Sequence, residues 1–523
     1  MHRIKKRSAA NIIGITLTGK LSHSEYRELV PYLEERIHKF GKIRLLIELD
    51  NWDGWDTHAT FDDFIFGVKN SFKIERTAFV VKTDLDKQAI LLDKPFSPWF
   101  GKNFRYFSSK ERKLAWAWIQ EGIEHTLPEE CRPNIAPKKA RYGSKQKVLI
   151  VGGGLTGLSF GALLKQRGFN PTIMEKSLDI AKSKGLSILF PNAADVFKGT
   201  GLYKAVLDAS ELIRSYHIYN ARGDLLRTIS FDSIIEKYGP IAVLPKERLI
   251  NILSERFTDK QLVKGLSVSK LLPSKNEVKV RLSDDSQEQY DYVIACDGAQ
   301  SGIREKVFGR IGISYSGYVI WRFALDRNSI DINGRTEYWH ADRNFSVFPY
   351  GDVLYGQASC KFAEIEDIPP KDSLTLLRAA FKDFAGHVPE VLKSLKDAHF
   401  VTHESIYQYN VQDIVQGRFA LLGDSSYAFH PKSPASLGFT LESCTILADL
   451  LCRSDSRHFW RPLYAYQKKV RNRFDYLYHQ WRHFELLPYL SIQHRMQVTD
   501  LCKELPTEEQ MIHFWDTYLS EPF

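Results

Sequence analysis

The chain has 523 residues, of which 43% are hydrophobic and 26% charged, with a formal net charge of +9. This is ordinary globular composition, and the length allows about two to four domains, since one core would not suffice. The charge is too mild to imply nucleic acid by itself. The six cysteines form no C-x-x-C pair, so no metal site is expected. The sequence shows neither a signal peptide nor a run of roughly 18 apolar residues, which favours a cytoplasmic protein.

Residues 1–125 are typical of a small α/β domain. Strands are predicted at "NIIGITLTG", "IRLLIEL", "RTAFVVKT" and "FRYFSS", and helices at "HSEYRELVPYLEERIHKFG", "FDDFIFGVKNSF" and "KERKLAWAWIQEG". In the first helix Tyr26, Leu29, Leu33 and Ile37 recur at helical spacing and share one face. This element order, with "GKLSHSEYRELVPYLEE" and "IRLLIELDNWDGWD", resembles the STAS-like (SpoIIAA-like) domain family.

Three segments carry unusual aromatic or basic residues. In "KPFSPWFGKNFRYF" the aromatic side chains fit either the domain core or a lid that contacts lipid or a hydrophobic ligand. Residues 126–146 are basic and contain proline, as expected of a solvated linker. Residues 456–523 are expected to be helical. Their interleaved basic and aromatic residues favour packing against the preceding domain, with a membrane surface as the alternative, and no nucleic acid is expected.

The stretch "KVLIVGGGLTGLSF", residues 147–160, interrupts an apolar run with three glycines. The G-x-G-x-x-G pattern lies between a predicted strand and a predicted helix, where the glycines permit a tight turn, the approach of a pyrophosphate and close helix packing. The helix N-terminus offers N–H groups to the phosphates. The next strand, "PTIMEK", ends at an acid that can accept both ribose hydroxyls. The predicted dinucleotide site consists of Gly152, Gly153, Gly154, Leu155, Thr156, Gly157, Glu175 and Lys176.

Two later strand ends place an acid beside a glycine. Asp297 and Gly298 occur in "YDYVIACDGAQSGIRE", and Gly423 and Asp424 in "GRFALLGDSSYAFHP". Each pair alone also fits a capped turn. The three sites in order, together with "GLSILFPNA", "GYVIWRFAL" and "YAYQKKVRNR", resemble the FAD-dependent aromatic hydroxylases of the para-hydroxybenzoate hydroxylase type.

This resemblance implies FAD as cofactor and NAD(P)H and O2 as co-substrates. In the family the glycine turn and Glu175 bind the ADP half, Asp297 and Gly298 support FAD and the passage of the nicotinamide, and Asp424 bonds the ribityl chain. Lys246 stands where the family usually has an arginine near the cofactor. The resemblance further implies that the flavin forms a C4a-hydroperoxide, which hydroxylates an aromatic or related small substrate. The chain has one dinucleotide turn. This agrees with the family, in which the nicotinamide binds without a Rossmann fold of its own.

The resemblance also implies an α/β fold with several parts. A small STAS-like α/β domain precedes a Rossmann-type FAD-binding domain, 147–455, with an inserted antiparallel-sheet substrate domain, about 211–240 and 311–405, and a C-terminal helical segment. Trp321, Phe348 and Tyr350 belong to that sheet and either form its core or wall a pocket for a planar aromatic substrate. The sequence identifies no catalytic residue.

The third motif departs from the family pattern. Tyr427 replaces a histidine, Pro431 is retained, and "KSPASLG" replaces a glycine turn. Pro434 and Ser436 cannot adopt the torsions of glycine, so the loop must take another course. We expect a helix still to begin there, with Ser436 as its cap.

Because turnover depends on this loop, alternatives stay open. One is a flavin-binding regulatory or sensor protein whose STAS-like domain binds a partner, either a protein or a lipid. Another is a different FAD oxidoreductase on the same fold, a prenyl reductase or a halogenase, although the halogenase motif W-x-W-x-I-P is absent.

Overall fold

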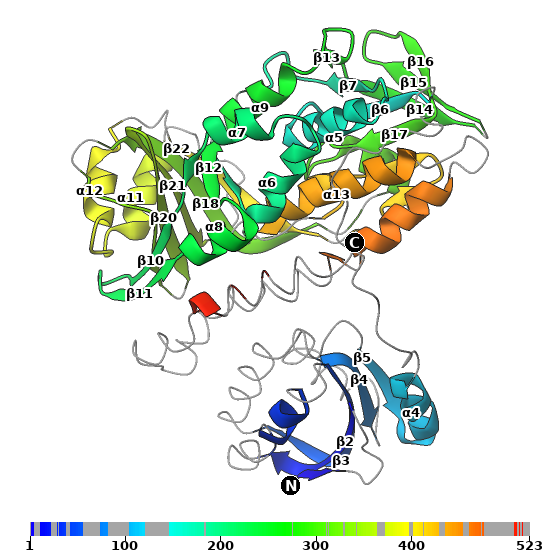
Figure 1. Ribbon diagram of the computed structural model, residues 1–523, viewed down its shortest axis with the longest axis vertical. Helices are drawn as coiled ribbons and strands as arrows, with labels where there is room; N and C mark the ends of the chain where they lie inside the picture. Colours follow the sequence, from blue (N-terminus) through cyan, green and yellow to red (C-terminus); the bar gives the residue numbers. More distant parts are fainter. Residues whose placement is uncertain are drawn as a thin grey trace. The chain divides into compact units, whose positions relative to one another are not determined.

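The structure is a computed structural model, and the chain divides into two compact units (Figure 1). Described residues up to Gln120 form the first unit, and those from Gln146 to Phe474, with a few near the C-terminus, form the second. The described residues are 2–4, 11–21, 29, 31–37, 42–55, 74–81, 104–120, 146–181, 185–274, 276–309, 311, 313–327, 330–340, 342–362, 372–396, 401–409, 411, 413–427, 435–452, 460–471, 473–474, 507–509, 512 and 515.

The first unit is built on a five-stranded sheet in the order β1-β2-β3-β4-β5, in which only β1 and β2 are antiparallel neighbours. Leu29, Leu33 and Ile37 are buried, as their helical spacing predicts. Trp116 and Ile119 of α4 pack into the core beside β3 and β4. The elements are β1 (His2–Ile4), β2 (Ile12–Leu21), β3 (Ile43–Trp55), β4 (Ile74–Val81), β5 (Phe104–Ser108) and α4 (Arg112–Gln120).

Some expectations for this unit lie outside the described residues. These are the helix at 61–72, most of the linker 126–146 and the aromatic residues Phe96, Trp99 and Phe100. The lipid contact based on those aromatic side chains therefore stays a prediction.

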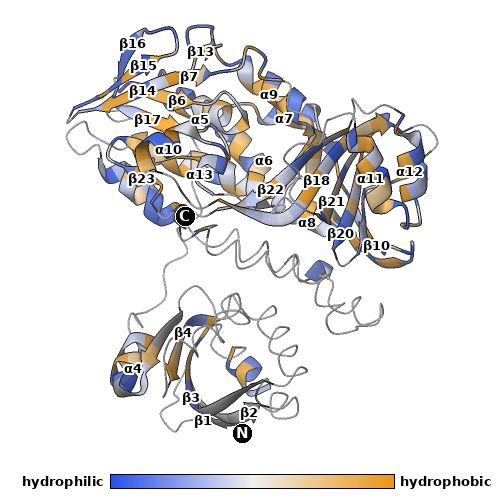
Figure 2. Cartoon of the chain, turned by 180° about the vertical axis from the view of Figure 1, so that it is seen from behind, coloured by the Kyte–Doolittle hydropathy of each residue, from blue (hydrophilic) through white to orange (hydrophobic). Residues whose placement is uncertain are grey.

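The second unit contains a six-stranded sheet in the order β13-β7-β6-β17-β24-β23, parallel except for the β24–β23 pair. Its central strands β6 and β17 are buried along their whole length, and Figure 2 shows them as hydrophobic. Such runs are typical of a parallel sheet covered on both faces. The strands are β6 (Val148–Val151), β7 (Thr172–Glu175), β13 (Leu262–Lys264), β17 (Tyr292–Ala295), β23 (Val415–Gln416) and β24 (Phe419–Leu421).

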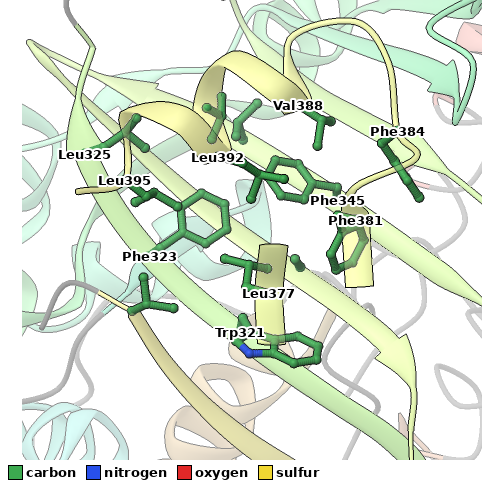
Figure 3. Close-up of a cluster of buried hydrophobic side chains, with 14 of the residues drawn as sticks. Trp321, Phe323, Leu325, Phe345, Leu377, Phe381, Phe384, Val388, Leu392 and Leu395 are labelled. Carbon is green, nitrogen blue, oxygen red and sulfur yellow. The ribbon is translucent and has the colours of Figure 1, made fainter. Parts of the chain in front are cut away.

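A seven-stranded sheet, in the order β11-β10-β19-β20-β21-β18-β22, forms the other half of this unit. All neighbours are antiparallel except β10 and β19. Side chains from one face meet α11 and α12 in a hydrophobic cluster (Figure 3). The elements are β10 (Ser215–Asn220), β11 (Leu225–Ser230), β18 (Ser314–Asp326), β19 (Arg335–Trp339), β20 (Arg343–Tyr350), β21 (Val353–Lys361), β22 (Val401–Gln408), α11 (Ser373–Phe381) and α12 (Val388–Ser394).

The remaining elements surround these two sheets. Helix α13 packs against α5 and α6, and the residues at 460–474 are helical where described. Within the described residues, every helix is too short or too polar to cross a membrane. The bounds are β8 (Leu186–Leu189), β9 (Glu211–Leu212), β12 (Ala242–Pro245), β14 (Val268–Pro273), β15 (Val278–Leu282), β16 (Gln287–Tyr290), α5 (Leu155–Gln166), α6 (Pro191–Lys198), α7 (Tyr203–Asp208), α8 (Asp232–Tyr238), α9 (Lys246–Ser254), α10 (Gly302–Phe308) and α13 (Ala435–Cys452).

Residues close to the C-terminus contact the second unit. The Ser233 hydroxyl donates to Glu508 (2.6 Å), and the ring of Trp515 stacks on Phe190, with 5.6 Å between the ring centroids. Phe190 immediately precedes α6, and Trp515 is only 4% exposed. The end of the chain therefore completes the packing around the start of α6.

Candidate cofactor site

The glycine turn lies between β6 and α5, and its geometry gives each glycine a role. Gly152 has φ +111°, and a Cβ there would lie 2.3 Å from the carbonyl oxygen of Cys296. A Cβ on Gly157 would lie 2.0 Å from the carbonyl oxygen of Gly152, so only glycine lets α5 approach the turn. Gly154, which precedes α5, has no atom within 4 Å of an added Cβ. This open side is where a phosphate can approach the helix N-terminus.

Glu175 at the end of β7 is fixed against this turn. One carboxylate oxygen accepts the Gly153 N–H (2.8 Å), and the other accepts the Ser177 N–H (2.8 Å). Each oxygen retains acceptor capacity for a ribose hydroxyl. Lys176, the next residue, is exposed, and no described contact directs it toward the turn.

Asp297 follows β17 and begins the second motif. One of its carboxylate oxygens accepts the Ile303 N–H (3.1 Å), while the other is buried without a hydrogen-bond partner among the described residues. Gly298 has φ +81° and open space on its Cβ side. An orphaned buried acceptor beside an open glycine fits a ligand that brings a hydroxyl donor.

The third motif meets the other two through direct contacts. Gly423 follows β24, and a Cβ there would lie 2.7 Å from the Thr156 hydroxyl oxygen at the start of α5. The Arg304 guanidinium, on α10, donates to the carbonyl oxygens of Ser425 (2.9 Å) and Ala299 (2.6 Å). It also stacks on Tyr409, whose hydroxyl donates to the Asp424 carbonyl oxygen. Because β6, β17 and β24 are neighbours, all three motifs lie at one edge of the sheet.

Sequence reasoning did not identify Arg304. The only signal is an arginine in "SGIRE" one helical turn after Ser301, whose hydroxyl caps α10. The sequence gives no indication that this guanidinium is 3% exposed and ties the second motif to the third.

Four charged groups lie near the third motif. Asp424 is open to solvent, yet desolvation by the surrounding protein raises the pKa of its carboxyl, against the opposing effect of Lys246. Burial lowers the pKa of Lys246, although Asp424 opposes the shift. Arg322 on β18 pairs with Glu404 on β22 (2.5 Å). The charges of both side chains affect the pKa values of Asp424 and Lys246. The structure thus brings Lys246 near Asp424 and adds an ion pair that the sequence did not reveal, while the place of Lys246 beside the cofactor stays a prediction.

The location of Arg322 identifies which face of the seven-stranded sheet is directed toward the cofactor site. Trp321, its neighbour on β18, points the opposite way, into the cluster with Phe381 and Leu377 of α11 (Figure 3). Trp321 is 0% exposed. Adjacent residues in a strand face opposite sides, and Trp321 is on the helix-covered side, so its position favours the core alternative over a pocket wall.

Phe348 and Tyr350 lie on the same side of the sheet as Arg322. Phe348 is 6% exposed and lies under the guanidinium of Arg335, whereas the Tyr350 hydroxyl donates to the carbonyl oxygen of Ala209 (2.9 Å). Both side chains contact other protein groups, and their assignment to a substrate pocket stays a prediction.

The same face carries a buried carboxylate, Glu337. It pairs with Arg335 and accepts hydrogen bonds from the Tyr216 hydroxyl (2.6 Å) and the Trp339 indole (2.8 Å). Burial alone would raise the pKa of Glu337, but the Arg335 charge and these hydrogen bonds lower it to about 2. This side of the sheet is therefore polar as well as aromatic.

The altered part of the third motif is only partly described, and Pro431 and Pro434 lie outside it. The Tyr427 ring stacks on Phe474, with 4.1 Å between the ring centroids, and is 2% exposed. Helix α13 begins at Ala435, so a helix does start in "KSPASLG". Ser436 lies inside its first turn, and the expectation that Ser436 caps the helix is wrong.

Comparisons with known proteins match a domain family to each of the two units. The SpoIIAA-like family profile matches residues 12–120, and the profile of an FAD-binding domain matches residues 145–323. The chain joins a SpoIIAA-like domain to an FAD-binding domain. Its homologues are flavin-dependent monooxygenases, which confirms the expectation of an FAD-dependent oxidoreductase.

Three relatives illustrate the similarity. Aurachin C monooxygenase/isomerase from Stigmatella aurantiaca is 25% identical over 306 residues, 58% of this chain and 80% of its own length. The 2-heptyl-3-hydroxy-4(1H)-quinolone synthase of Pseudomonas aeruginosa is 24% identical over 314 residues, 58% of this chain and 80% of its own length. The structure of Klebsiella pneumoniae HpxO complexed with FAD and uric acid superposes with a TM-score of 0.65 at 21% identity, covering 73% of this chain and 98% of that one. At that identity the superposition shows a shared fold.

The residues present fit FAD. The open approach at Gly154, the fixed carboxylate of Glu175 and the orphaned oxygen of Asp297 are the features that an adenine dinucleotide requires. No group of potential metal ligands occurs within the part of the chain that the structure describes.

Proposed function

We propose that the FAD-binding unit is a monooxygenase that uses NAD(P)H and O2 to hydroxylate a small heteroaromatic substrate. The observation that supports this most strongly is the convergence of three motifs at the carboxyl ends of neighbouring strands β6, β17 and β24. Ligands of open α/β sheets bind outside this edge. The names of the relatives, which include a quinolone synthase, favour a bicyclic nitrogen heterocycle.

The residues of the chain would divide the work as follows. The turn at Gly152–Gly157 and the N-terminus of α5 bind the pyrophosphate, and Glu175 binds the ribose. Asp297 and Asp424 accept hydrogen bonds from hydroxyl groups of the cofactor. Bound FAD supplies hydride acceptance and oxygen activation.

The charges of Lys246 and Arg322 would favour negative charge near the third motif. A preorganised cation in a site of reduced polarity stabilises a developing anion more than it would in water. The role of Glu404 is to hold the Arg322 guanidinium in place through their ion pair.

Anaerobic mixing tests the proposal. The purified protein with bound FAD is mixed with NADH or NADPH, with and without a panel of 4-quinolones and hydroxylated pyridines, and the flavin absorbance is followed. We expect at least one nucleotide to bleach the flavin, faster with a ligand, and aerobic mixing to give a hydroxylated product by mass spectrometry.

Two controls separate the outcomes. Glu175→Ala should lower FAD retention and should catalyse no reaction that the wild-type protein lacks. This result would link the reaction to the described site. If FAD binds but neither nucleotide reduces it with any ligand, the monooxygenase proposal fails and the regulatory alternative takes its place. If reduction occurs without oxygen transfer, another FAD oxidoreductase is indicated.

A further inference from the structure

The helical residues described at 460–471 and 473–474 are amphipathic, and one side of this helix packs against the FAD-binding unit. Leu463, Tyr466 and Val470 are each 0% exposed. The Tyr466 hydroxyl donates to the carbonyl oxygen of Leu421 at the end of β24 (2.9 Å). The Gln467 side-chain oxygen accepts the backbone N–H groups that precede and begin β23 (2.9 and 3.0 Å). The rotation of the helix about its own axis is therefore fixed.

The same helix exposes two aromatic rings. Trp460 is 45% exposed and Tyr464 47% exposed, and their centroids lie 6.4 Å apart, one helical turn along the chain. The guanidinium of Arg461 lies 5.5 Å from the Trp460 ring centroid. Large aromatic side chains are seldom left exposed together without a reason.

The same helix carries several basic side chains. Residues 460–474 contain five basic side chains and no acidic one, "WRPLYAYQKKVRNRF". Arg473 is turned inward, 3.6 Å from Glu442, so it does not contribute to the surface. Lys468 and Lys469 are exposed. We call the exposed residues Trp460, Arg461, Tyr464, Lys468 and Lys469 the aromatic–basic face, with Lys469 at its edge, half a turn round the helix from Trp460.

We propose that the aromatic–basic face docks on an anionic lipid bilayer. Tryptophan and tyrosine are favoured at the depth of lipid headgroups, where their rings meet the acyl boundary and their polar atoms stay hydrated. Exposed lysine and arginine side chains beside them are attracted to anionic headgroups. The charge of the face complements such a surface, and the fixed rotation of the helix keeps both rings exposed.

The ring geometry favours lipid over single-stranded nucleic acid. The planes of Trp460 and Tyr464 are inclined by 72°, edge to face. Successive bases stack on rings that offer accessible parallel faces. This pair does not offer them, whereas insertion between lipid headgroups requires no parallel arrangement.

Vesicle flotation of the full-length protein tests the proposal. The vesicles are pure phosphatidylcholine or a mixture with about 30% phosphatidylglycerol, in low and in high salt. We expect binding to the anionic vesicles at low salt and its loss at high salt, because surface charges are screened. Lys468→Glu with Lys469→Glu should weaken partitioning by at least about 25-fold, since each lysine is worth roughly fivefold.

Matched variants assign the binding to this face. Lys260→Glu with Lys270→Glu changes the same charge at exposed positions elsewhere and should leave partitioning within about twofold. Trp460→Ala with Tyr464→Ala should reduce partitioning by roughly tenfold at unchanged charge. FAD content of each variant reports whether the unit is folded.

A spectroscopic measurement adds an independent result. Lipids brominated near the headgroup should quench tryptophan fluorescence in the wild-type protein, and Trp460→Phe should abolish most of that quenching while binding persists.

Three results would overturn the proposal: equal binding to both kinds of vesicle, wild-type binding by the Lys468/Lys469 variant, or charge-dependent binding of an oligonucleotide without binding of vesicles. The second result would indicate that the segment "KPFSPWFGKNFRYF" of the SpoIIAA-like domain contacts the lipid. The third would indicate that nucleic acid is the partner.

Discussion

Arg304→Met tests the geometry of the cofactor site most directly. The guanidinium donates to the carbonyl oxygens of Ser425 and Ala299 at 2.9 and 2.6 Å. A hydrogen bond from a charged donor contributes roughly 1.5 to 3 kcal/mol, and part of this is offset because methionine removes a buried charge. We expect the variant to lose about 3 kcal/mol of unfolding free energy. FAD affinity should fall about tenfold or more, because the turns after β17 and β24 are no longer tied.

Urea unfolding of the apoprotein, followed by circular dichroism, and titration of FAD by fluorescence quenching measure the two effects. Arg281→Met is the matched control, because its pair with Asp285 (2.9 Å) is exposed and should contribute less than about 1 kcal/mol. Arg304→Lys retains the charge without the planar fork and should be intermediate. If Arg304→Met changes stability by less than about 1 kcal/mol and leaves FAD affinity intact, the proposed tie between the turns is refuted.

Three further outcomes are expected. Gly157→Ala should abolish FAD retention, measured as the flavin-to-protein absorbance ratio, because the new Cβ would lie 2.0 Å from the Gly152 carbonyl oxygen; normal flavin content would contradict this. The pKa of Glu337 is about 2 when folded and about 4.3 when unfolded, so its stabilisation, on the order of 3 kcal/mol, is complete above about pH 5 and lost as the pH falls toward 2. Glu337→Gln should therefore flatten the acid side of the stability profile in denaturation at a series of pH values. Trp321→Ala should lower the unfolding free energy by about 3 to 5 kcal/mol, because Trp321 packs in the core. A changed substrate KM at unchanged stability would instead show that Trp321 lines the substrate pocket.

The parts of the site that the sequence predicted are those governed by local rules. A glycine turn after a buried strand, and an acid at the end of the next strand, have one workable geometry each, and Gly152, Gly157 and Glu175 adopt it. The order of elements likewise predicted the parallel sheet, because strands alternating with helices form one.

The parts that the sequence did not predict depend on contacts between distant segments. The alternation along β18 shows that Trp321 and Arg322 face opposite sides, but only α11 and α12 decide which side is the core. Arg304 becomes important only because β17 and β24 are neighbours in the sheet. The cap assigned to Ser436 failed because Ser436 lies inside α13, and local sequence fixes helix boundaries only to within one or two residues.

The order of strands in the FAD-binding sheet has a consequence for biosynthesis. Val148 begins β6 and Leu421 ends β24, and Tyr466 and Trp515 contribute to the packing later still. A growing chain therefore carries its phosphate turn long before β24 has been synthesised. Contacts this distant in sequence form slowly and leave apolar strands uncovered in the meantime. We therefore expect FAD to load only after β24 has joined the sheet, and chaperones to reduce aggregation of the nascent chain before then.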